Sequence, residues 1–167
     1  MERNWSYTIQ EGEHKGVTLW SGRYCAVCAI VFCYKDGKWY VLANKRGSGA
    51  PDFQGYWNLP CGFIEANESG EQAASRETVE ETGVFVYPND FTFHSVETDP
   101  TISNNGNVTL RYIAKIYRGG IPKIGKPSGE ENEVDRIKWI ALSHIEEHDW
   151  AFHHKELIHK IIREGIL

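Results

Sequence analysis

Three glutamates near the middle of the chain recur at helical spacing. Glu77, Glu80 and Glu81 stand at i, i+3 and i+4, which on an α-helix confines them to an arc of about 100° on one face. Like charges at this spacing each destabilise a helix by roughly 0.2–0.5 kcal/mol. A bound divalent cation reverses that effect, because hard cations such as Mg²⁺ take carboxylate oxygens as ligands. The alternative for these three residues taken alone is a solvated acidic helix face.

The residues on either side predict where this helix begins and ends. Ser69 is a favourable N-cap, and Gln72 three residues later completes a capping box. Gly83 is placed to end the helix, because glycine readily adopts the left-handed conformation found there. The sequence therefore predicts a helix over 70–82, with the glutamates on its last turns.

A longer pattern surrounds the glutamates. Residues 62–84 read GFIEANESGEQAASRETVEETGV and match G-x5-E-x7-R-E-U-x-E-E-x-G-U, where U is an aliphatic residue. This segment resembles the Nudix box of the Nudix hydrolase (MutT-like) family. Thr78 departs from the pattern, at a position that prefers an aliphatic residue. Cys61, just before the box, stands where family members often have a second glycine, and a positive φ there would suit cysteine poorly.

The resemblance implies a loop–helix–loop that holds divalent metal ions, Mg²⁺ or Mn²⁺. Carried onto this chain, it makes Glu77, Glu80 and Glu81 the metal ligands, and Glu80 is also expected to be catalytic. The backbone carbonyl of Gly62 would add another oxygen, which explains a residue without a side chain beside the ion. Glu68 would support the loop through hydrogen bonds or bind metal weakly.

The resemblance implies two further catalytic roles. Arg76 would pair with a carboxylate and fix its rotamer. A general base often comes from a loop before the last strand, and here that loop contains Glu130, Glu131 and Glu133. We expect Glu131 or Glu133 to reach the attacking water, with an acidic surface loop as the alternative for each.

Such a site would cleave a diphosphate linkage in a small, nucleotide-like substrate. Metal ions neutralise the diphosphate oxygens, orient a water and lower its pKa. Pro100 lies where ADP-ribose-cleaving members of the family carry a proline, although proline is common in loops for other reasons. The expected substrate is therefore linked through a nucleoside diphosphate: ADP-ribose, a dinucleotide or a nucleotide sugar.

Three other functions compete with this one. A nucleoside triphosphate pyrophosphohydrolase would use the same residues. A Nudix-like sensor that binds nucleotides without cleaving them would need an output module, and the residues after Leu142 are too few for a separate domain. A prenyl diphosphate isomerase would need an acid–base pair that usually includes a cysteine, and Cys61 is near the expected site.

The rest of the chain predicts an α+β domain with a mixed β-sheet, which the resemblance specifies as a Nudix-type α/β/α sandwich over residues 1–167. Asp36-Gly37 and Asn105-Gly106 predict hairpin turns. Strands are expected at 24–34, 38–46, 57–59, 84–87, 91–97, 108–117 and 136–140, and further helices at 142–148 and 155–163.

Composition narrows the class of protein. Apolar residues make up 41% and charged residues 25%, both ordinary for a globular domain. The net charge of −5 gives no attraction to nucleic acid or to an anionic membrane. No apolar run approaches the roughly 20 residues that span a bilayer. We therefore expect a cytoplasmic protein that binds neither nucleic acid nor membrane, and a homodimer is compatible with the sequence.

Cysteines, histidines and tryptophans offer weaker sites. Cys25 and Cys28 form a C-x-x-C on a predicted strand, where they point in opposite directions and cannot share an ion; buried reduced thiols are expected. His144 and His148 are spaced i, i+4 but lack an obvious third ligand, so surface positions are expected. Trp57 is expected to pack in the core rather than stack on a base.

Overall fold

The computed structural model describes every residue except 1–5, 21, 100, 103–106, 118–119 and 130–131. The expectations for Glu130, Glu131, Pro100 and the Asn105-Gly106 turn therefore lie outside the described residues. None of the helices in the described part has the length and apolarity that crossing a membrane requires.

The order of strands and helices along the chain is that of an α+β protein. The strands are β1 (Ser6–Thr8), β2 (Thr18–Trp20), β3 (Cys25–Lys35), β4 (Lys38–Arg46), β5 (Trp57–Asn58), β6 (Cys61–Phe63), β7 (Thr92–Glu97), β8 (Val108–Ile116) and β9 (Val134–Ala141). The α-helices are α1 (Gly70–Thr82) and α2 (His154–Arg163), and the 3-10 helices are η1 (Pro88–Asp90) and η2 (Leu142–Glu147).

Strand β3 is the centre of a seven-stranded mixed sheet. One of its edges pairs with β8 in parallel along its length, from Cys25 to Cys33. The other edge is divided: Phe32–Lys35 pairs with β4, and Ala26–Cys28 pairs with β6, both antiparallel. This division brings β6, and with it the start of the 62–84 segment, beside the first half of β3.

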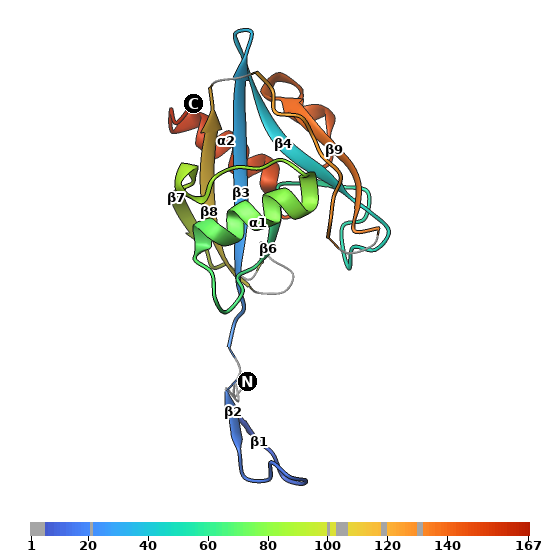
Figure 1. Ribbon diagram of the computed structural model, residues 1–167, viewed down its shortest axis with the longest axis vertical. Coiled ribbons are helices and arrows are strands. Elements are labelled where there is room, and N and C mark those ends of the chain that lie inside the picture. The colour runs from blue at the N-terminus through green and yellow to red at the C-terminus, as the bar shows by residue number, and fades with distance from the viewer. Residues whose placement is uncertain (1–5, 21, 100, 103–106, 118–119, 130–131) are drawn as a thin grey trace.

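Helices cover both faces of this sheet, with α1 in front of it and α2 behind it (Figure 1). Alternate residues of β3 serve the two faces, so Val27 and Ala29 pack with Ala73 of α1. Cys28 and Ile30 pack on the other face, in the core that includes the apolar side of α2. Because both faces are buried, the strand is a continuous apolar run rather than an alternating one. The α/β/α sandwich is confirmed.

The Asp36-Gly37 turn is also confirmed. It joins β3 to β4 with Lys35 opposite Lys38, and both turn residues have positive φ, 49° and 77°. A two-residue turn with two positive φ angles matches the twist of the paired strands, which explains the choice of Asp-Gly.

Two predictions about elements need correction. Residues 84–87 are extended but form no strand: Val84 and Val86 are buried in the α1 layer, and the chain then enters η1. Residues 142–147 form a 3-10 helix, not an α-helix. The strand predicted at 57–59 is present as β5, whereas the sequence did not predict β1, β2 or β6.

The first two strands form a separate hairpin, with Ser6 opposite Trp20 and Thr8 opposite Thr18. It extends away from the layered body of the protein (Figure 1). The sheet that carries the site is therefore built from Cys25 onward.

Candidate active site

Helix α1 has both of the predicted ends. Ser69 Oγ accepts a hydrogen bond from the backbone N–H of Gln72, and the Gln72 side chain accepts one from the backbone N–H of Ser69. Gly83 ends the helix in the left-handed conformation, φ 65°. The capping box and the glycine cap are both confirmed, and they set the register that brings the glutamates to one side of the helix.

The last turn of α1 is held by the loop that precedes β9. The backbone N–H groups of Ser128 and Gly129 donate to the carbonyl of Glu80, at 2.8 and 3.3 Å, and Gly125 N–H donates to Thr82 O at 3.1 Å. These bonds satisfy carbonyls that a helix end leaves without partners. They also attach the loop that leads to Glu133 to the helix that carries the other glutamates.

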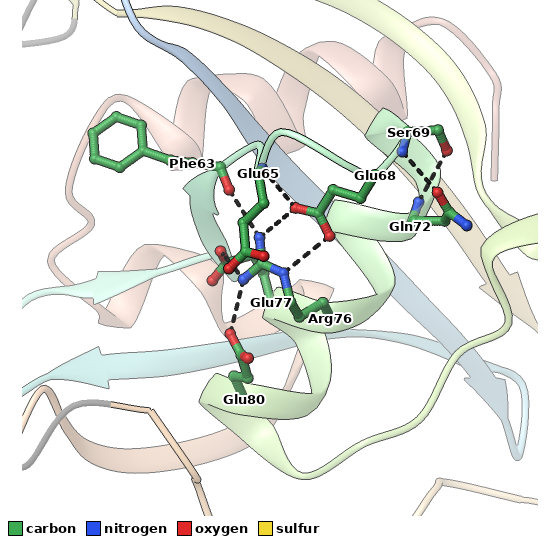
Figure 2. A network of polar contacts seen from close by, with 8 residues as sticks. All are labelled: Phe63, Glu65, Glu68, Ser69, Gln72, Arg76, Glu77 and Glu80. Carbon is green, nitrogen blue, oxygen red and sulfur yellow. Dashed lines mark hydrogen bonds and ion pairs between the residues drawn. The ribbon is translucent and has the colours of Figure 1, made fainter.

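Arg76 is surrounded by carboxylates (Figure 2). Its guanidinium donates to Glu68 through Nε at 3.0 Å and Nη2 at 2.6 Å, to Glu77 at 2.6 Å and to Glu80 at 2.9 Å. A further bond reaches the backbone carbonyl of Phe63 at 2.8 Å. Paired donors in a rigid fork set the orientation of each carboxylate. The sequence predicted that Arg76 pairs with a carboxylate, and in the structure it pairs with three.

Glu77 lies against the backbone of Gly62. Its side chain is buried, and a Cβ placed on Gly62 would collide with its carboxylate. Burial raises the pKa of Glu77, Arg76 opposes that rise, and the charges of Glu80 and Glu133 add to it. Only glycine leaves room for this carboxylate beside the loop.

Glu81 reaches the other side of the same loop. It is 6% exposed and accepts hydrogen bonds from Asn44 Nδ2 at 2.6 Å and from the backbone N–H of Cys61 at 3.2 Å. Burial first, and then the charges of Glu77 and Glu133, raise its pKa well above the ordinary value. No cation among the described residues forms an ion pair with Glu81, which leaves its carboxyl buried beside two other carboxylates.

The two remaining carboxylates of the predicted set differ in their surroundings. Glu68 accepts from Arg76 and from the backbone N–H of Glu65, and the hydrogen bonds from Arg76 hold its pKa below the ordinary value. Glu80 has the more open position, with 38% of its side chain exposed. All five predicted metal-binding positions thus come together where the loop before α1 meets the last turns of that helix.

Glu133 is the loop glutamate that the structure describes. It lines the same cavity as Gly62 and Glu77, and its charge contributes to the raised pKa of both Glu77 and Glu81. It therefore lies close to Glu77 and Glu81 of α1, although it is far from them in the sequence.

The cavity itself measures about 460 Å³. Two arginines line it, Arg46 from β4 and Arg111 from β8. Arg46 is paired with Asp52 at 2.6 Å, and Arg111 with Glu97 at 3.2 Å. A second hollow, lined by loops around 46–48 and 132–135, contains none of the α1 glutamates.

Sequence reasoning missed both arginines, because neither belongs to a motif. It also missed two aromatic residues of the cavity, Phe63 and Phe152. Phe63 is 53% exposed and its ring lies 5.5 Å from that of Tyr24, while Arg46 lies over the ring of Phe152. Only the register of β8 against β3 and the return of the chain before α2 bring these residues to one place.

Two thiols and an imidazole cluster in the wall of the cavity. The Sγ atoms of Cys28 and Cys61 lie 3.7 and 3.8 Å from Nε2 of His154, and all three residues line the cavity. Leu59 donates its backbone N–H to Nδ1 of the same histidine at 3.0 Å. The sequence singles out Cys61 as a departure from the motif and as a possible isomerase acid or base, but gives no sign that it lies beside Cys28 and His154.

Burial decides the expectations for the cysteines and for Trp57. Cys28 is buried as expected, but the expectation for Cys25 was wrong: this thiol is exposed, on the opposite face of β3 as the alternation requires. Trp57 packs in the core, 6% exposed, and His148 lies against its ring. Cys61 has no positive φ, because it begins strand β6, so the missing second glycine causes no backbone strain.

Comparison with known proteins places this architecture in a family. Residues 23–161 match the model of the NUDIX domain. Phosphatase NudJ of Escherichia coli K12 is 28% identical over 112 residues, which cover 67% of this chain and 65% of NudJ. The match thus spans slightly less than two thirds of the length of this curated relative.

Solved structures share the fold. The NUDIX domain of Shewanella oneidensis NrtR, complexed with ADP ribose, is 27% identical, with a TM-score of 0.69 over 89% of this chain and 91% of that one. A bifunctional NMN adenylyltransferase/ADP ribose pyrophosphatase of Francisella tularensis is 23% identical, with a TM-score of 0.72 over 86% of this chain and 42% of that one; this likeness concerns the fold alone. With the domain model matching most of its length, including the whole glutamate-bearing segment, the chain belongs to the NUDIX family.

Proposed function

We propose that this protein is a divalent-metal-dependent hydrolase that cleaves the diphosphate linkage of a nucleoside-diphosphate-linked substrate such as ADP-ribose. One observation carries the proposal: the carboxylates of Glu77 and Glu133 line one cavity together with Arg46 and Arg111. Glu80 and Glu81 lie close to Glu77, because the charge of Glu80 helps to raise the pKa of Glu77 and the charge of Glu77 helps to raise that of Glu81. Carboxylates suit hard cations, and guanidinium groups suit phosphate oxygens.

The donor set fits Mg²⁺ or Mn²⁺. Glu77 and Glu81 are buried with raised pKa values, and burying a carboxylate without a cation is unfavourable. Asn44 Oδ1, beside Glu81, is buried with no hydrogen-bond partner among the described residues. Oxygen atoms from Gly62, Glu77, Glu80 and Glu81 would hold the ions, with Glu68 in support. When bound, the ions neutralise the diphosphate oxygens and lower the pKa of a coordinated water.

The protein's own residues would bind and orient the substrate. Arg46 and Arg111 retain donor atoms beyond their bonds to Asp52 and Glu97, because a guanidinium has five N–H groups. The cavity volume of about 460 Å³ lies in the range usual for small-molecule sites. The ADP ribose bound by the NrtR domain, 27% identical to this chain, supports a substrate of that class over a nucleoside triphosphate.

Proton transfer is assigned to the loop before β9. Glu133 lines the same cavity as Glu77, so it would accept the proton of the attacking water as the water adds to phosphorus. Glu131, two residues earlier, is the other proposed base. Arg76 would not touch substrate: four of its hydrogen bonds hold Glu68, Glu77 and Glu80 in place, and the fifth reaches the backbone carbonyl of Phe63.

The test is a substrate panel with product analysis. ADP-ribose, a dinucleotide, a nucleotide sugar and nucleoside triphosphates are incubated with Mg²⁺ or Mn²⁺, with a chelator as the control. We expect ADP-ribose to give AMP and ribose 5-phosphate only with metal. A tenfold or larger preference for a triphosphate in kcat/KM would overturn the substrate class. Tight nucleotide binding without turnover would overturn the hydrolase, and conversion of isopentenyl diphosphate to its isomer would identify an isomerase.

A further inference from the structure

Cys28 and Cys61 lie directly opposite each other on β3 and β6. Hydrogen-bonded and non-hydrogen-bonded pairs alternate along two antiparallel strands. Ala29 N–H donates to Pro60 O at 2.8 Å, directly beside the Cys28–Cys61 pair, and Ile64 N–H donates to Cys25 O four residues further along β3. Cys28 and Cys61 are therefore a non-hydrogen-bonded pair, the kind whose Cα atoms approach most closely.

This pairing suits a disulfide. Non-hydrogen-bonded antiparallel pairs have Cα atoms about 4.5 Å apart, inside the range of about 4.4–6.8 Å that disulfides span. Both sulfur atoms already converge on His154 Nε2, at 3.7 and 3.8 Å. Neither Cys25, which is exposed, nor Cys33, whose Sγ donates to Gly120 O, belongs to this cluster.

A metal ion is the competing occupant, because two thiols and an imidazole lie within 4.8 Å of one another. Zinc would suit such ligands, but the histidine is oriented against it. Leu59 N–H donates to Nδ1, so that nitrogen carries the lone pair and the ring proton of the neutral imidazole lies on Nε2. Nε2–H then points at the sulfur atoms as a donor and offers no lone pair to an ion.

We propose that Cys28 and Cys61 form a modification site, at which a hydroperoxide produces a reversible disulfide between β3 and β6. Cys61 is partly exposed in the cavity wall, whereas Cys28 is fully buried, so Cys61 meets the oxidant first. Its sulfur, after losing its proton to water, attacks the peroxide; the O–O bond breaks, and a sulfenic acid and one molecule of water or alcohol are formed.

The second step closes the bond. The Cys28 sulfur, having released its proton, attacks the Cys61 sulfur; the S–S bond forms as the S–O bond breaks, and the leaving hydroxide takes up a proton as water. Two thiols lose two electrons and the peroxide gains them. A small dithiol reverses the reaction by thiol–disulfide exchange.

The modification would act on the neighbouring glutamates. The backbone N–H of Cys61 donates to Glu81, and the next residue is Gly62, against which Glu77 packs. Drawing Cys61 toward Cys28 moves both contacts. This consequence rests on the proposed function, and we expect oxidation to lower the hydrolysis rate about tenfold or more, since small misplacements of a site have effects of that size.

The experiment detects disulfide formation directly, without a measurement of hydrolysis. Metal-free protein is treated with hydrogen peroxide, alkylated under denaturing conditions and mapped by mass spectrometry. We expect alkylation to fall from all four cysteines to Cys25 and Cys33, with a linked peptide pair containing Cys28 and Cys61, and dithiothreitol to restore all four. The matched control is Cys25→Ser with Cys33→Ala, which should form the same linkage, whereas Cys61→Ser and Cys28→Ala should each form none.

Two results would overturn the proposal. One is a peroxide-treated protein in which Cys28 and Cys61 are oxidised separately or remain free. The other is stoichiometric Zn²⁺ binding by the metal-free protein that protects both thiols from alkylation and is lost in Cys28→Ala, which would identify a metal site. The linkage is read without any assay of hydrolysis, so failure of the proposed function would leave a formed disulfide in place.

Discussion

At the scale of single residues, Glu81 combines burial, negative charge and contact with the loop that begins the 62–84 segment. We predict that Glu80→Gln and Glu81→Gln each lower kcat by about 100-fold or more, because each removes charge that would hold a metal ion. The measurement is steady-state kinetics at saturating Mg²⁺. Glu71→Gln, a change to an acid in the first turn of the same helix, is the control and should keep most activity. Near-normal kcat in both variants would contradict the metal-site assignment.

The raised pKa of Glu81 predicts how stability depends on pH. Its folded pKa lies above its unfolded value near 4.5, so the folded state binds more protons, and stability falls as pH rises from the unfolded pKa through the folded pKa. In metal-free protein, the Tm of wild type relative to Glu81→Gln should therefore decrease between about pH 5 and about pH 8. Thermal melts at both pH values test this. A constant difference between the two proteins would mean that Glu81 ionises as it does in water.

Glu133 is predicted to act in the transition state. Glu133→Gln should lower kcat with little change in KM, because the proton moves only as the water attacks. Glu147→Gln, outside the cavity, is the control. If Glu133→Gln keeps full activity, Glu131→Gln is expected to show the loss instead; full activity in both variants would place the base elsewhere.

At the scale of elements, the end of α1 depends on close contact between two glycines. Gly83 has φ 65°, and a Cβ there would collide with the backbone of Gly125. Gly37 has φ 77° with nothing near its Cβ position. Both alanine substitutions incur the left-handed strain, about 1–2 kcal/mol, but only Gly83→Ala also displaces the loop that leads to Glu133.

We therefore predict that Gly83→Ala lowers the free energy of unfolding more than Gly37→Ala does, by about 1 kcal/mol or more. It should also lower kcat, whereas Gly37→Ala should not. Denaturant titrations and kinetics on the two variants provide the comparison. Equal losses of stability would show that the loop adjusts without cost and that its position does not depend on the helix end.

At the scale of the whole molecule, the β1–β2 hairpin stands apart from the layered body (Figure 1), and the family match begins at residue 23. A two-stranded hairpin has little stability of its own. We predict that a chain beginning at residue 23 keeps its Tm within about 3 °C, a change that corresponds to less than about 1 kcal/mol for a domain of this size. A larger decrease would show that the hairpin contributes to the core.

The homodimer stays a prediction. Light scattering on the full chain and on the chain that begins at residue 23 tests it.

The sequence by itself determined the features that depend on short-range order. The helix at 70–82, its capping box, its glycine end and the Asp36-Gly37 turn follow from residues only a few positions apart, whose backbone preferences are local. The α+β class and the grouping of Glu77, Glu80 and Glu81 on one face follow from the same periodicity. The resemblance to the Nudix box rests on one continuous segment and so needed no tertiary information.

Only the tertiary structure decided what comes together from distant parts of the chain. Val84 and Val86 alternate like a strand, yet they pack under α1 without pairing, because burial and strand pairing produce the same pattern. Arg46 and Arg111 reach the cavity through the pairing of β4 and β8 with the central strand. Cys28, Cys61 and His154 meet because β6 takes the edge of β3 that β4 leaves free, a register that no local preference encodes.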